Sequence, residues 1–157
     1  MTRLRGRALR GARVHAAFPH GRWLTTTLLG ALRLDGTTAC IAIPGATDTE
    51  VYREYVQGVL CPLLRPGDVV VMDNLLPHKN GGTLRLIADV GAEGRFLPAY
   101  SPDLNPIEKM WSKLKNALRS AEARTSETLL EAVAAALASV TPRDAINWFA
   151  SCGCSIL

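Results

Sequence analysis

A wholly apolar run of four residues, Val69-Val70-Val71-Met72, limits most strongly how this chain can fold. Pro66-Gly67 marks a turn shortly before the run, and Asp73 ends it. A short apolar run between such signals is typical of a central strand buried on both faces, because a strand with one face in water alternates apolar and polar residues. We therefore expect this strand inside a sheet that is flanked by helices.

The segments on either side of this strand predict a mixed α/β order. Asp35-Gly36 separates two runs, residues 23–34 and 38–43, and an Asp-Gly pair in such a place favours a β-hairpin. Residues 48–63 follow helical spacing, with an apolar stripe of Val51, Tyr55, Val56, Val59 and Leu60. A second short buried strand is expected over residues 95–97, and further helices over residues 79–90, 106–121, 126–140 and 142–150.

The sequence shows no internal repeat and no low-complexity linker, so we expect a single domain over residues 1–157. Its expected parts are a basic N-terminal arm (1–22), a core (23–121) and C-terminal helices (122–157). The apolar stretches are too short or too interrupted to span a bilayer, and no secretory signal pattern is visible. The four cysteines lack zinc-finger spacing and indicate reduced thiols. These features predict a cytoplasmic protein with no membrane partner.

The basic residues are unevenly distributed along the chain. Residues 1–34 hold seven arginines and no acidic residue, whereas the remainder holds 11 basic and 14 acidic residues. Clustered arginines pair with phosphates and release counterions, so nucleic acid is the favoured partner, although a solvated arm without a partner has the same composition. We expect the DNA contacts of this arm at Arg3, Arg5, Arg7 and Arg10.

Two carboxylates are candidates for a functional site. Asp73 directly follows the apolar strand, where it either caps the next turn or acts as a rigid metal ligand. Glu108 is the third residue of a predicted helix behind Asn105 and Pro106, so it either reaches back to the Asn105 amide as in a capping box or binds a ligand. Carboxylates on different elements suit Mg²⁺, and pairs of such ions activate the attacking and leaving oxygens in phosphodiester chemistry. Such a site normally requires a third acid.

The predicted helix over residues 106–121 has two distinct faces. Its apolar stripe is Ile107, Met110, Trp111, Leu114 and Leu118, and we expect Trp111 in the core rather than exposed for stacking. A separate face carries Glu108, Ser112, Lys115 and Arg119. An acid followed by cations suits a metal site beside a track for phosphates, and it equally suits an ordinary solvated face.

Three stretches resemble the DDE transposases of the insertion sequence 630 family, the bacterial branch of the mariner superfamily. They are PGDVVVMDN (66–74) with His78-Lys79, FLPAYSPDLNPIE (96–108) and WSKLK (111–115). Asp73 and Glu108 are separated by 34 residues, the spacing characteristic of the second and third catalytic acids of that family. The resemblance extends over essentially the whole chain.

The resemblance implies a ribonuclease H-like mixed sheet flanked by helices, with Asp73 and Glu108 as catalytic metal ligands. The implied cofactor is Mg²⁺, for which Mn²⁺ substitutes. The implied chemistry is hydrolysis at transposon ends, followed by attack of the freed 3′-hydroxyl on target DNA at TA, a step that deforms easily. Residues that either support the acids or contact DNA are expected at Asn74, His78, Lys115 and Arg119, with helix capping as the alternative for the first two.

One departure from the family pattern concerns the first catalytic acid, which in the family lies on the first strand. Here no acid precedes Asp35, and Asp35 belongs to the predicted hairpin turn, where it cannot serve as a substitute. The family's N-terminal helix-turn-helix region is also not found.

We therefore expect an incomplete catalytic domain whose first strand is missing, through frameshifting, a misassigned start or gene decay. The alternative is an inactive DNA-binding or dimerising fragment. Expected partners are transposon-end and target DNA in the nucleoid, and the resemblance allows for a homo-oligomer or for association with an upstream transposase fragment.

Overall fold

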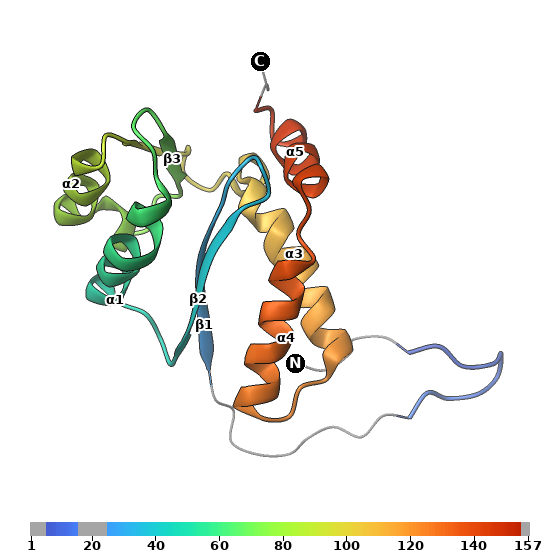
Figure 1. Ribbon diagram of the computed structural model, residues 1–157. Helices are drawn as coiled ribbons and strands as arrows, with labels where there is room; N and C mark the ends of the chain where they lie inside the picture. Colours follow the sequence, from blue (N-terminus) through green and yellow to red (C-terminus); the bar gives the residue numbers. More distant parts are fainter. Residues whose placement is uncertain (1–5, 16–24, 155–157) are drawn as a thin grey trace.

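A computed structural model describes residues 6–15 and 25–154 of the chain (Figure 1). Its elements are β1 (Thr26–Leu32), β2 (Thr38–Pro44), α1 (Thr49–Tyr55), β3 (Val69–Met72), α2 (Gly81–Asp89), β4 (Glu93–Phe96), α3 (Pro106–Ala121), α4 (Ser126–Ala138) and α5 (Pro142–Ser151). The mixed α/β class predicted from the sequence is confirmed. Among the described residues, no helix is both long and apolar enough to cross a membrane.

Strands β1 and β2 form the predicted antiparallel hairpin, with Gly30 opposite Cys40. The turn residue Gly36 has φ +88°, a conformation that glycine adopts without steric cost. Gly30 is needed for a different reason. A Cβ atom on it would lie 2.5 Å from the Cys40 sulfur and 2.8 Å from the Trp111 ring, closer than non-bonded atoms can approach.

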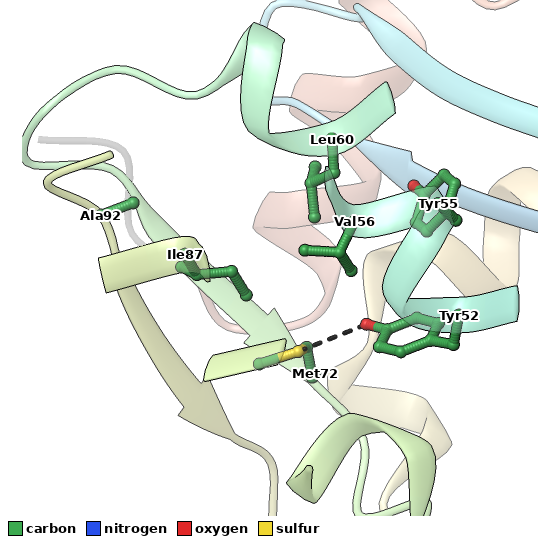
Figure 2. Packing of buried hydrophobic residues seen from close by; sticks show 7 residues of the cluster. All are labelled: Tyr52, Tyr55, Val56, Leu60, Met72, Ile87 and Ala92. Carbon is green, nitrogen blue, oxygen red and sulfur yellow. Dashed lines mark hydrogen bonds between the residues drawn. The ribbon is translucent and has the colours of Figure 1, made fainter. Parts of the chain in front are cut away.

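The hairpin packs on both of its faces, and a hydrophobic cluster lies on each side of it. Leu29, Ala31 and Ile41 pack against the cluster formed mainly by α1, the helical turns after it, and α2 (Figure 2). The alternate residues Leu28, Leu32 and Cys40 pack against the cluster around α3 and α4. In Figure 1 the hairpin correspondingly lies between α1 and the long helix α3. The side-chain alternation of a strand thus lets one hairpin join two cores.

The helices follow the predicted boundaries closely where capping residues define them. Helix α3 begins and ends as expected, and its stripe residues Met110, Leu114 and Leu118 are buried. Trp111 packs in the same core, as expected. The helix expected to start at residue 79 starts at Gly81, because Asn80 accepts hydrogen bonds from the Gly82 and Thr83 amides and is its N-cap.

The helix predicted over residues 48–63 is present with two adjustments. Asp48 caps α1 by accepting from the Val51 amide, and the chain then continues through a π turn at Val56–Leu60 and a 3₁₀ turn at Cys61–Leu63. The buried stripe begins at Tyr52, not at Val51 as predicted, because Tyr52 lies one turn before Tyr55 and Val56 and faces the same core.

The predicted single sheet is not formed by hydrogen bonding within the described residues, and this corrects the expectation for the central strand. Among the residues that the structure describes, strand β3 pairs in parallel with β4 and β1 pairs with β2, giving two two-stranded sheets. Val69 and Val71 are therefore 47% and 52% exposed rather than buried on both faces. The strand expected over residues 95–97 lies at Glu93–Phe96, and its Phe96 is also exposed rather than buried.

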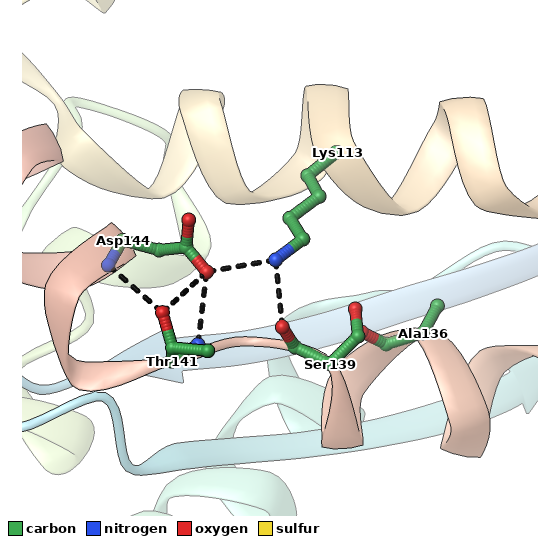
Figure 3. Close-up of polar contacts among 5 residues, drawn as sticks. All are labelled: Lys113, Ala136, Ser139, Thr141 and Asp144. Atoms are coloured by element: carbon green, nitrogen blue, oxygen red, sulfur yellow. Dashed lines mark hydrogen bonds and ion pairs between the residues drawn. The ribbon is translucent and has the colours of Figure 1, made fainter.

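The C-terminal helices are held to α3 by a polar network (Figure 3). Lys113 Nζ donates to the Ser139 carbonyl oxygen at 2.6 Å and to the Asp144 carboxylate at 2.7 Å. The same carboxylate accepts from the Thr141 amide and hydroxyl at the start of α5. One lysine thereby fixes the end of α4 and the beginning of α5 against α3.

Candidate active site

Asp73 lies directly after β3, and its carboxylate is fixed on one side. His78 Nδ1 is 2.6 Å from Asp73 Oδ1, and the Leu75 amide donates to the same oxygen at 3.3 Å. The Asp73 side chain is 47% exposed, and no hydrogen bond to its other oxygen is formed within the described part of the chain. One oxygen of this carboxylate is thus held by the protein, while the other has no hydrogen-bond partner among the described residues.

His78 is itself held in place by the hydrophobic cluster behind it. Its side chain is 18% exposed, and its ring centroid is 4.4 Å from that of Tyr52. The Tyr52 hydroxyl donates to the Met72 sulfur at 3.5 Å (Figure 2). Burial, and secondarily the charge of Asp73, raises the pKa of Tyr52 to about 12, so this phenol is neutral at physiological pH. A neutral, buried tyrosine therefore supports the histidine that contacts Asp73.

Asn74 joins the two loops that leave the parallel strand pair. Its side-chain amide donates to the Leu97 carbonyl oxygen, and the Leu97 amide donates to the Met72 carbonyl oxygen at 2.8 Å. The loop after β3 and the loop after β4 are thus hydrogen-bonded to each other where they leave the sheet. Because parallel strands end at the same edge, this is where ligands bind in open α/β sheets.

Glu108 lies in the first turn of α3 and does not act as a helix cap. The N-cap residue Asn105 accepts a hydrogen bond from the Ile107 amide at 3.4 Å. The Asn105 amide, which a capping-box glutamate would bind, donates instead to the Pro102 carbonyl oxygen at 3.0 Å. The Glu108 side chain is exposed and forms no ion pair or hydrogen bond with any described residue. The capping alternative for Glu108 is therefore not adopted, and its carboxylate is available.

Asp73 and Glu108 line one groove of about 700 Å³, which lies between β1 on one side and β3 on the other. Two further acids border it, but both are engaged. Asp68 forms an ion pair with Arg33 at the opposite end of β3, and Asp35 accepts from the Thr37 amide in the hairpin turn. Within residues 6–15 and 25–154 no group of three or more His, Cys, Asp or Glu side chains could hold a metal ion. Asp73 and Glu108 thus line the same groove, and no third acid joins them in such a group among the described residues.

The singled-out cations that the structure describes, Arg7, Arg10, Lys115 and Arg119, do not line this groove. Lys115 is exposed and Arg119 half-buried on the outer face of α3, where Arg119 donates to Asn116 at 3.2 Å. Arg7 and Arg10 are exposed in the described part of the N-terminal arm. Arg3 and Arg5 lie outside the described residues.

Sequence reasoning did not single out Tyr52 or Leu97 as parts of the site. Tyr52 could have been found from its spacing to Tyr55 and Val56, which places it on the buried face of the helix. No local signal marks Leu97, because it contributes only its backbone to Asn74.

Taken together, these features define an α/β protein with an acidic site at the carboxyl end of a parallel strand pair. The comparison with known families makes this specific, because residues 1–130 match the DDE superfamily endonuclease family, and the chain belongs to it. The family implies nuclease or transposase activity on DNA and the use of divalent metal ions. No curated protein matches the sequence.

Proposed function

We propose that this chain forms the catalytic domain of a DNA transposase of the insertion sequence 630 type, with Asp73 and Glu108 as two of its metal-binding acids. The observation that carries the proposal is that both carboxylates line one groove and that Glu108 is not used as a cap. The proposed reaction is hydrolysis at the transposon ends, followed by strand transfer into target DNA at TA, a step of low deformation energy.

The chemistry of the two acids fits Mg²⁺, with Mn²⁺ as a substitute. Mg²⁺ binds through one or two carboxylates, waters and phosphate oxygens, and both acids offer exposed oxygens to the same groove. A bound metal would polarise the phosphodiester and assist the attacking and leaving oxygens. The protein residues would hold the ion through the Asp73 oxygen that His78 does not contact and through Glu108, with His78 fixing the orientation of Asp73.

We further propose that the third carboxylate is carried by a strand that occupies the groove between β1 and β3. Each of these strands uses one edge for its partner, and its other edge has no backbone partner among the described residues. Val69 and Val71 offer apolar surface at this groove. Strand addition there would satisfy both edges, bury this surface and give the ribonuclease H-like sheet that the resemblance implies.

Two steps test this proposal. The DNA upstream of the Met1 codon is sequenced and translated in all three frames, and we expect an apolar strand that ends in Asp. The protein extended by that strand is then assayed for Mg²⁺-dependent nicking of a plasmid that carries the element's ends. We expect activity in the extended protein, little or none in the 157-residue chain, and loss on Asp73→Asn or Glu108→Gln.

Glu131→Gln is the matched control, because Glu131 is an exposed acid on α4 and lies away from the groove. It should leave the rate unchanged. Efficient cutting by the 157-residue chain, abolished by Asp73→Asn, would overturn the need for the added strand. Cutting by the extended protein that survives both Asp73→Asn and Glu108→Gln would overturn the assignment of the acids.

A second candidate function is favoured by the lack of a group of three acids among the described residues. In this case the chain binds DNA or a second transposase copy without cutting. The absence of an Asp-ending strand from every upstream frame, together with DNA binding by the inactive chain, would select this alternative.

A further inference from the structure

Exposed apolar side chains lie on the loop that contains Asp73 and on the loop that leads to Glu108. In the loop after β3, Leu75 is 57% and Leu76 is 85% exposed. In the loop after β4, Tyr100 is fully exposed and Leu104 is 40% exposed. Hydrophobic side chains on these loops contribute nothing to either core, so they are available to a binding partner.

The two loops present these side chains from the same edge of the sheet. Met72 and Phe96 are paired at the ends of the parallel strands, and the loops begin directly after them. The bonds from Asn74 to Leu97 and from Leu97 to Met72 hold the two loops together. Leu75 and Leu76 are therefore within four residues of Met72, and Tyr100 is four residues after Phe96, so all three follow the strands at the same edge of the sheet.

Tyr100 is held in an unusual conformation. Its φ is +57°, in the left-handed region that is unfavourable for residues other than glycine, asparagine and aspartate. Pro98 and Pro102 lie two residues on either side of it, and Pro102 begins a 3₁₀ turn that leads to the α3 cap. Its ring makes no hydrogen bond or ring contact within the described residues. A costly backbone conformation that presents an aromatic ring to solvent suggests a ligand for the ring.

The surroundings of the loops include a cation that suits DNA. Lys79 follows Leu76 by three residues and is exposed without an ion-pair partner among the described residues, so it can bind a phosphate. The two acids proposed to act on a phosphodiester flank the loops in sequence and line the adjoining groove. Apolar wedges and aromatic rings beside phosphate-binding cations are the means by which proteins separate and grip stacked bases.

We infer that Leu76 and Tyr100 contact unstacked bases next to the phosphodiester that is cut, with Tyr100 stacking on a base and Leu76 inserted into the opened step. This inference rests on the proposed function, because it assigns the DNA to the same site. It goes beyond that function by specifying that the DNA is bound with its bases opened. Opening base pairs has a free-energy cost, so DNA that is already unpaired there should bind more tightly.

The test compares the affinity of the full chain for two duplexes of about 30 base pairs, one fully paired and one with two adjacent central mismatches. We expect the mismatched duplex to bind roughly 3- to 10-fold more tightly, corresponding to part of the unpairing energy. Tyr100→Ala and Leu76→Ala should bring this ratio close to one. Tyr100→Trp should preserve it, because the larger ring still stacks.

Three controls separate the contributions. Tyr100→Asn removes the ring but suits the left-handed backbone, so a lost preference in this variant reports the ring and not the loop conformation. Lys79→Gln should weaken both duplexes equally, because phosphate contacts do not depend on pairing. Leu130→Ala alters an exposed leucine on α4 and should change nothing.

An unchanged preference in Tyr100→Asn and Leu76→Ala would overturn the inference. A loss of self-association in these variants, measured by light scattering, with no change in either DNA affinity would overturn it in favour of a protein interface. The readout needs no cleavage, so it remains informative if the proposed catalytic function fails. Conversely, cleavage by the extended protein without a preference for mismatched DNA would reject this inference alone.

Discussion

At Asp73, one carboxylate oxygen contacts His78 and the other has no hydrogen-bond partner among the described residues, so the contact with His78 fixes which oxygen is left for a metal ion. Residues that orient a metal ligand typically contribute 10- to 100-fold to metal affinity or activity. We therefore expect His78→Ala to lower the nicking rate of the extended protein roughly 10- to 100-fold and to raise the Mg²⁺ concentration needed for half-maximal rate. The measurement is a Mg²⁺ titration of the nicking rate.

The matched control for this prediction is Tyr52→Phe. This variant keeps the ring that packs on His78 and loses only the weak hydrogen bond to the Met72 sulfur. Its rate and metal requirement should be close to those of the unmodified protein. If His78→Ala and Tyr52→Phe behave alike, His78 does not position the acid.

Gly30 is required for packing between the hairpin and α3. Gly30→Ala would place a methyl group against Cys40 and Trp111, and overpacking of this kind typically costs about 1–3 kcal/mol. We expect a lower midpoint of urea unfolding with an unchanged slope. Gly58→Ala is the comparison, because a Cβ there meets no atom within 4 Å and alanine is the better helix former by about 0.5–1 kcal/mol. Equal effects of the two substitutions would contradict the packing argument.

Individual residues could be selected from the sequence, but their roles depend on contacts that the sequence does not reveal. The pattern around Asn105 by itself favours a capping role for Glu108, whereas the family resemblance favours a metal ligand. The structure excludes the capping-box role of Glu108, because the Asn105 amide donates to the Pro102 carbonyl oxygen instead. Likewise, the position of Asp73 after β3 could be predicted, whereas its contact with His78 depends on the turn at Pro77–Lys79.

Among the secondary-structure elements, the helices were predictable and the exposure of the strands was not. Helix ends are defined locally, as at α3, by a cap at Asn105 and a proline at the first position. The exposure of β3 depends on which strands flank it, and no local pattern contains that information. This is why an apolar run that suits a buried strand has Val69 and Val71 exposed.

The contact between α3 and α5 should make stability depend on acid pH. Hydrogen bonding from Lys113, then from Thr141, lowers the pKa of Asp144 to about 2 from an unfolded value near 3.8. A group whose pKa is lower in the folded state stabilises the fold fully above its unfolded pKa, and this contribution is lost as the pH falls through the folded pKa. The contribution is therefore present at neutral pH and lost between about pH 4 and pH 2.

We expect Asp144→Asn to lower the thermal midpoint by a few degrees at pH 7 and by progressively less below pH 4, until the two proteins coincide near pH 2. Thermal unfolding at a series of pH values provides the measurement. Lys113→Met should lose the pH-dependent part of its difference over the same range, but a constant difference should remain, because it also removes the hydrogen bond to the Ser139 carbonyl oxygen. A difference that stays constant down to pH 2 would mean that the ion pair does not stabilise the folded state.

For the whole molecule, one hairpin lies between two hydrophobic clusters, and the groove at its β1 edge separates β1 from β3. The Arg33–Asp68 ion pair bridges the groove at the end away from Asp73. The element order could be predicted from the sequence, whereas the separation into two small sheets could not. This separation arises because β1 and β3 each have an edge at the groove without a partner among the described residues, and edge pairing depends on residues distant in the sequence.

The basic N-terminal arm should supply a large share of the electrostatic DNA binding of the molecule. All acidic residues follow position 34, whereas Arg3, Arg5, Arg7 and Arg10 precede it and Arg7 and Arg10 are exposed. Each arginine that neutralises a phosphate steepens the plot of log affinity against log salt by about 0.9. Replacing all four with glutamine should therefore reduce this slope by up to about 3 to 4 and weaken binding most at low salt, equally for duplexes of any sequence.

Fluorescence anisotropy at several salt concentrations measures the slope. Arg85→Gln with Arg143→Gln is the control, because both arginines are exposed on helices and without an ion-pair partner among the described residues. If the four-arginine variant keeps the original slope, the phosphates are bound elsewhere, and the outer face of α3 with Lys115 and Arg119 becomes the next surface to test.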